Sequence, residues 1–135
     1  MTANDKSTVR QGKIKINDRV IPVVAMTSDV IWFDFLAICD GPRSQNDYID
    51  IACEFHAVVV SDVPVFNSDT EDSARRFINL VDEFYDRNVK LAIAAQMPLE
   101  ALYQGTKLAF EFERTKSRLM EMQSVEFLSR PHQID

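Results

Sequence analysis

The sequence predicts a single α/β domain with a mostly parallel sheet covered by helices and an N-terminal β-hairpin. Three observations support this fold class. The chain has 135 residues, 46% of them hydrophobic and 27% charged, which is the composition of one globular domain. Residues 13–24 have the pattern of a hairpin. From residue 44 onward, helical apolar stripes alternate with short apolar runs, and this alternation is typical of a parallel sheet with covering helices.

The first predicted elements are strands. Residues 13–24 combine two alternating segments with an Asn17-Asp18 turn, and this pattern predicts a β-hairpin. Pro22 lacks a backbone N–H, and we therefore expect the second arm of the hairpin at an edge of the sheet. Residues 30–36 (VIWFDFL) follow as a third strand, because alternate positions place apolar side chains on one face.

The next segment alternates helices with a buried strand. Residues 44–47 (SQND) have the pattern of a capping box and predict the start of a helix. Residues 58–60 (VVV) are a short apolar run, which is typical of a buried parallel strand. Ser68 and Glu71 predict a second capping box, and the apolar stripe after them predicts a helix over residues 69–87.

The last third of the chain continues the alternation. Residues 91–95 predict a second buried strand, and Pro98 and Gly105 mark the start and the end of a short helix. Residues 108–112 alternate and predict another strand, and a final helix is expected over residues 115–128. The predicted order after the first three strands is thus α-β-α-β-α-β-α, for which right-handed crossovers are expected.

Composition and charge exclude several classes of protein. The net charge is −6, from 21 acidic and 15 basic residues, and such a chain repels phosphate backbones, so we expect no nucleic-acid partner. No apolar run approaches the roughly 18 residues of a membrane span, and the polar N-terminus is not a signal peptide. The two cysteines, Cys39 and Cys53, form no C-x-x-C pair; we therefore expect no zinc site, and two free thiols suit a reduced cytoplasm.

The scarcity of glycine decides a functional question. The chain has only three glycines, Gly12, Gly41 and Gly105. A Walker A loop requires G-x-x-x-x-G-K-[ST], and a dinucleotide fingerprint requires G-x-G-x-x-G. Because no two of these glycines are close enough for either motif, the sequence contains no standard phosphate loop. We therefore expect no catalytic residue, no metal site and no bound cofactor in this chain alone.

Four long strings carry a resemblance to a known family. They are FDFLAIC at 33–39, PRSQNDYIDIACEFHAVVVSDVP at 42–64, ARRFINLVDEFYDRNVKLAIAAQMPLEALYQG at 74–105 and FEFERTKSRLMEMQSVEFL at 110–128. The chain resembles, over nearly its whole length, the C-terminal region of the ZapE-like AAA-type ATPases. This family comprises bacterial cell-division ATPases and mitochondrial relatives known as lactation-elevated proteins.

The resemblance implies a non-catalytic C-terminal domain over residues 13–132, preceded by a linker, or the ragged start of an excised piece, over residues 1–12. Family members carry Walker A, Walker B and an arginine finger in an upstream P-loop domain, which would be the partner of this domain. The parent protein would bind and hydrolyse ATP with Mg²⁺ in the cytoplasm and act in cell division through the tubulin-like protein FtsZ. Cys53 departs from the family, whose members often carry arginine there.

Two other classes of function stay open. The alternative to an ATPase part is an independent α/β adaptor that recognises an acidic protein through its arginines. A hydrolytic enzyme built around Asp62 is the weakest hypothesis, because a paired base and a phosphate cradle are missing. Asp62 follows an apolar run, where α/β folds place ligands, and it would contact a metal or phosphate or merely cap a turn before Pro64.

The segment around Asp62 is also similar in layout to the second half of an AAA-type core. A strand, a long helix, a second strand and a Pro-containing turn follow in that order. Asp62 would occupy the Walker B position, but Val63 stands where a catalytic Glu is needed. Ala95 and Gln96 would lie at the sensor-1 position. The domain would then be a degenerate copy of an AAA-like half-domain.

The arginines supply the candidate binding residues. Arg114 and Arg118 lie, with Lys116, near the predicted start of the last helix, where positive charge is unfavourable unless an anion is present. They are candidates for sensing an anion or a nucleotide phosphate, and the alternative is neutralisation by acidic residues nearby in sequence. The candidates for an interface with the ATPase domain are Arg43, Tyr48, Arg75, Arg76 and Arg87. Pairing of Arg75 and Arg76 with Asp72 or Asp82 is the structural alternative.

Overall fold

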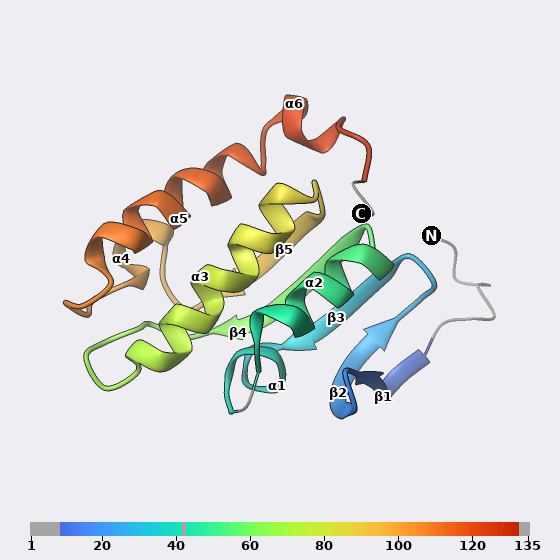
Figure 1. The fold of residues 1–135 in the computed structure, drawn as a ribbon. Helices are drawn as coiled ribbons and strands as arrows, with labels where there is room; N and C mark the ends of the chain where they lie inside the picture. The colour runs from blue at the N-terminus through green and yellow to red at the C-terminus, as the bar shows by residue number, and fades with distance from the viewer. Residues whose placement is uncertain (1–8, 42, 133–135) are drawn as a thin grey trace.

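A five-stranded sheet with helices on one side forms the architecture of the protein (Figure 1). The computed structural model describes residues 9–41 and 43–132. The strands lie in chain order: β1 (Val9–Ile16), β2 (Arg19–Met26), β3 (Val30–Asp34), β4 (Ala57–Val63) and β5 (Lys90–Ala95). The first three strands pair antiparallel, whereas β3, β4 and β5 pair parallel. The predicted α/β class with an N-terminal hairpin is confirmed.

The hairpin forms where the sequence predicts it, with a longer first arm. Its turn uses Asn17 and Asp18, both with a positive φ (49° and 66°), and these residue types tolerate that conformation well. The edge position predicted from Pro22 is wrong, because β2 lies between β1 and β3. β2 pairs with β3 only at Ala25 and Met26, so the missing N–H of Pro22 removes no hydrogen bond from that ladder.

The third strand is shorter than predicted. β3 ends at Asp34, and helix α1 (Phe35–Cys39) begins at the next residue. The reason is a cap: the backbone N–H of Leu36 donates to Asp34 Oδ2 at 3.2 Å, which satisfies one of the free donors of the first helical turn.

One predicted capping box is present and the other is wrong. At the start of α2 (Gln45–Glu54), the Ser44 backbone N–H donates to Asp47 Oδ2 at 2.9 Å. Helix α3 (Glu71–Asp86) begins after Thr70 instead of Ser68, since Asn67 and Thr70 form a turn in which the Asn67 N–H donates to Thr70 Oγ1 at 2.9 Å.

The Glu71 carboxylate serves a distant segment instead of a capping box. It accepts hydrogen bonds from the Tyr103 hydroxyl and from the backbone N–H groups of Thr106 and Lys107. These bonds, the Tyr103 bond above all, lower the pKa of Glu71. A Cβ at Gly105 would lie 2.7 Å from Tyr103 Oη and 2.8 Å from Glu71 Oε1, so glycine is the residue that fits this close approach.

The strand predicted at residues 108–112 is wrong, because these residues open helix α5 (Ala109–Glu121). Leu108 and Phe112 are buried four residues apart, whereas Phe110 is 82% exposed, and this spacing is helical. The predicted single helix over 115–128 is also wrong. After α5, Ser124 caps the separate helix α6 (Val125–Leu128) by accepting from the Phe127 N–H at 3.1 Å.

The core lies between the sheet and the helices. Four fully buried phenylalanines from α1, the loop after β4, α3 and α5 form a cluster in which the centroids of neighbouring rings are 5.5–6.3 Å apart; they are Phe35, Phe66, Phe77 and Phe112. The cluster joins elements that are far apart in sequence. Short helix α4 (Leu99–Leu102), preceded by Pro98, packs beside it through the buried Leu102.

The other face of the sheet carries no helix among the described residues (Figure 1). On β3 and β4 buried and less buried positions alternate. Trp32, Val59 and Ala92 are neighbours across β3, β4 and β5 on the less buried side, and this side is called the open face below. The prediction that β5 is buried is wrong, because β5 is an edge strand with Ala92 and Ala94 exposed.

Candidate functional site

The predicted basic site lies on α5, away from the start of that helix, and Arg118 is in its last turn. α5 begins at Ala109, so Arg114 and Arg118 are both beyond its first turn. Both arginines therefore lie away from the positive N-terminal end of the helix, and their predicted role in anion binding depended on that end. Arg114 is exposed, whereas Arg118 is partly buried against α3. Lys116 pairs with Glu113 at 2.7 Å.

Arg118 has an internal carboxylate partner. Its guanidinium forms an ion pair with Asp82 on α3 and lies 5.0 Å from the centroid of the Tyr85 ring. The Tyr85 hydroxyl in turn donates to Glu121 Oε1 at 2.9 Å. The sequence offered Asp82 as a partner for Arg75 and Arg76 on its own helix, but in the structure Asp82 pairs with Arg118. These contacts tie α5 to α3, and nucleotide sensing by Arg118 stays a prediction.

Replacing Arg118 with alanine is expected to lower the free energy of unfolding by about 1–2 kcal/mol, because a part-buried ion pair and a cation–π contact are lost together. Chemical denaturation of the purified chain measures this. Arg114→Ala is the matched control on the same helix and should leave the unfolding midpoint unchanged. Equal effects of the two substitutions would show that the Asp82 contact does not hold the helices together.

The five interface candidates are in different environments. Tyr48 is completely buried, and its hydroxyl donates to the Ile38 carbonyl at 2.8 Å, so it is a core residue here. Arg87 pairs with Glu83 at 2.6 Å, and the Arg43 Nε–H donates to the Ala37 carbonyl at 2.9 Å. The remaining two candidates, Arg75 and Arg76, lie on α3, exposed and partly buried respectively.

An acidic pair marks the carboxyl ends of the parallel strands. Asp62 lies in an irregular part of β4 with a left-handed φ of 60°. Its carboxyl group neighbours that of Asp34 at the end of β3, and partial burial and this neighbouring carboxyl raise the pKa of Asp34. Sequence reasoning singled out Asp62 but missed Asp34. The available signal was that adjacent parallel strands end side by side, each here with an aspartate.

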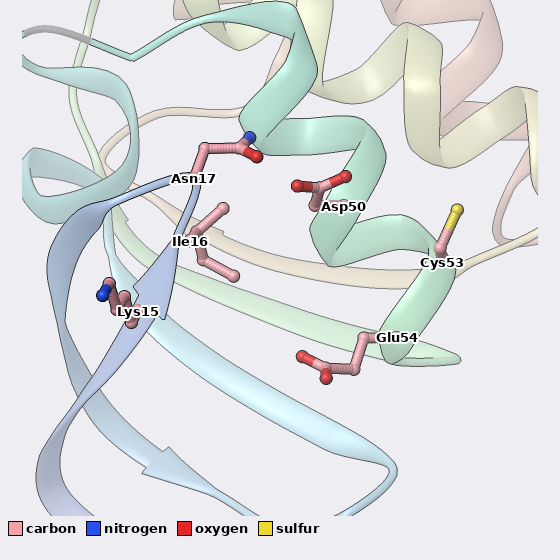
Figure 2. A pocket seen from close by; sticks show the side chains of 6 residues that line it. All are labelled: Lys15, Ile16, Asn17, Asp50, Cys53 and Glu54. Atoms are coloured by element: carbon pink, nitrogen blue, oxygen red, sulfur yellow. The ribbon is translucent and has the colours of Figure 1, made fainter.

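A shallow hollow of about 430 Å³ separates β1 from α2. Figure 2 shows Lys15, Ile16 and Asn17 on the strand side, and Asp50, Cys53 and Glu54 on the helix side. Cys53 thus lines this hollow together with Asp50 and Glu54. The other thiol, Cys39, is buried, and burial raises its pKa to about 12, which removes it as a nucleophile at neutral pH.

A comparison with protein families identifies the family of this chain. A family model described as AFG1-like ATPase matches residues 2–131. The chain belongs to the AFG1-like ATPase family. The resemblance to ZapE-like ATPases read from the four strings is thereby confirmed.

The chain is also similar to individual curated proteins. The chain is 47% identical over 119 residues to the cell division protein ZapE of Escherichia coli K12, a match that covers 88% of this chain and 32% of the relative. It is 27% identical to an uncharacterised protein of Schizosaccharomyces pombe, covering 96% and 35%. It is 34% identical to lactation elevated protein 1 homolog B of Danio rerio, covering 65% and 18%. No solved structure matches.

The AFG1-like chain therefore spans about a third or less of the length of the curated relatives it matches. An ATPase needs a site that holds a nucleotide and Mg²⁺. The residues in hand do not fit such a site: no phosphate loop occurs in the sequence, and the described residues contain no group of three or more potential metal ligands. No helix in the described part is long and apolar enough to cross a membrane.

Proposed function

We propose that this chain is the non-catalytic C-terminal domain of an AFG1-like ATPase. The parent binds and hydrolyses ATP with Mg²⁺ through a P-loop in its remaining polypeptide, and it acts in the cytoplasm in cell division through FtsZ. The observation that carries the proposal is the family match over residues 2–131 in a chain whose three glycines cannot form a phosphate loop.

The layout of the second half agrees with a supporting role. β4, α3, β5 and α4 follow in the order of the second half of an AAA-type core. Asp62 and Val63 are at the end of β4; in this layout Asp62 would correspond to a Walker B acid, with Val63 in place of the catalytic Glu. A carboxylate without the water-orienting Glu and without a phosphate loop supports no phosphoryl transfer.

The purified 135-residue chain is expected to show no ATP turnover above background, whereas the full-length gene product hydrolyses ATP. A phosphate-release assay on both proteins measures this. The Asp62→Ala chain is the control for a hidden site: turnover by the chain that this substitution abolishes would contradict the proposal. A full-length product without a Walker A motif, or without ATPase activity, would also contradict it.

The cell-division role needs a separate measurement. Co-sedimentation with GTP-assembled FtsZ polymers is expected for the full-length protein, with an unrelated ATPase as the control. Binding to FtsZ by the 135-residue chain alone, in a gene product without ATPase activity, would instead favour the adaptor hypothesis.

A further inference from the structure

We propose that the open face of the sheet is the docking surface for the rest of the AFG1-like ATPase polypeptide. This inference rests on the proposed function and adds to it the place of contact. It names Trp32, Val59 and Ala92 as the centre of that contact.

The pattern of burial defines the surface. On β4, Val58 and Val60 are fully covered by the helices, whereas Val59 between them is only partly buried. The same alternation on β3 buries Ile31 and Phe33 and leaves Trp32 39% exposed. The open face therefore carries apolar side chains on the very strands whose other face is core.

Trp32 is held in place as an apolar platform. It is the one tryptophan in the sequence. Its indole Nε1–H donates to Ser61 Oγ on the adjacent strand at 2.9 Å, so the polar atom of the ring already has a partner within the sheet. A large aromatic side chain with its polar group satisfied and more than a third of its surface exposed is typical of a contact residue.

The occupant follows from the sheet type and from the length of the relatives. All-parallel sheets occur almost only with both faces covered. The parallel part of this mixed sheet, β3 to β5, has described helices on one face only. The match to the Escherichia coli relative spans 32% of that protein, so roughly two-thirds of such a polypeptide lies outside it. That polypeptide is long enough to supply the second layer.

Charge at the rim adds a feature of the partner. The carboxyl groups of Asp34 and Asp62 are neighbours at the carboxyl ends of β3 and β4. Two adjacent carboxyl groups favour a cation beside them. The docked segment is therefore expected to place a basic side chain at this end of the sheet.

Cysteine labelling tests the proposal. Ala92→Cys and Ala94→Cys place a thiol on exposed positions of β5, and Ala109→Cys on α5 is the matched exposed control. All three carry Cys53→Ser, and Cys39 is buried. Maleimide labelling rates are compared between the 135-residue chain and the full-length gene product. Both β5 thiols are expected to react at least about tenfold more slowly in the full-length protein, and the control thiol equally in both.

Three results would overturn the docking surface: equal rates at both β5 thiols in the two proteins, slowing at one of them only, or slowing of both in the 135-residue chain as its concentration is raised. The last result would assign the face to a second copy. The ATPase assay on the same full-length preparations separates the two proposals. Protected β5 thiols in a protein without ATPase activity support docking and refute the proposed function, whereas activity with reactive thiols refutes docking alone.

Discussion

Replacing Phe77 with alanine is expected to lower the free energy of unfolding by about 3–5 kcal/mol. Phe77 is completely buried on α3, and its ring packs against those of Phe35, Phe66 and Phe112. The substitution removes apolar contacts and leaves a cavity whose walls belong to four different segments. Because these segments are anchored elsewhere, they cannot all collapse into the space.

Urea denaturation followed by circular dichroism measures the loss. Phe110→Ala is the matched control, because Phe110 is 82% exposed on α5, and a surface substitution changes stability by no more than about 0.5 kcal/mol. A loss below about 1 kcal/mol for Phe77→Ala would contradict the packing of α3 against the sheet.

Replacing Asp47 with alanine is expected to cost about 2–4 kcal/mol, because a buried carboxylate that joins three partners is removed. Asp47 is completely buried at the start of α2. Asn17 Nδ2 donates to its Oδ1 at 3.0 Å, the Ser44 N–H to its Oδ2 at 2.9 Å, and Arg19 forms an ion pair with it. The carboxylate therefore fastens the hairpin turn to the helix. Asp50→Ala, at an exposed position of α2, is the control.

The same carboxylate predicts a dependence of stability on pH. Burial alone would raise the pKa of Asp47, but the hydrogen bonds from Asn17 and Ser44 and the charge of Arg19 outweigh it, and the pKa is lowered from 3.8. A lowered folded-state pKa gives stability that is complete above the unfolded value and is lost as pH falls through the folded one. The urea midpoint of the unsubstituted chain should thus decrease as the pH is lowered below about 4. For Asp47→Ala this decrease should be smaller. Equal acid sensitivity of the two proteins would contradict the role of Asp47.

The parts of the fold that could be predicted are those set by neighbouring residues. The hairpin depends on Asn17 and Asp18, and the start of α2 depends on Ser44 and Asp47, which are three residues apart. Apolar alternation failed where a short segment fits two periods. Leu108, Phe110 and Phe112 read equally well as one face of a strand, and only the burial of Leu108 and Phe112 without Phe110 identifies a helix.

The remaining features depend on contacts between distant residues. Thr70 replaces Ser68 at the start of α3 because of a turn with Asn67, and Glu71 is drawn to a segment 35 residues away, at Thr106. At the candidate site, the pairing of Arg118 with Asp82 spans 36 residues. No spacing rule within one helix could select that partner. The meeting of Asp34 and Asp62 likewise becomes visible only once β3 and β4 are paired.

The order of the strands has a consequence for how the protein is made. Each strand from β2 to β5 lies beside the strand that precedes it in the chain. On a ribosome, every new strand therefore finds its neighbour already synthesised, and the sheet can grow from its N-terminal edge without waiting for distant residues. The phenylalanine cluster is completed later, because Phe112 is the last of its four rings to be translated. A nascent chain that stops before α5 should accordingly have its strands paired but its hydrophobic core incompletely packed.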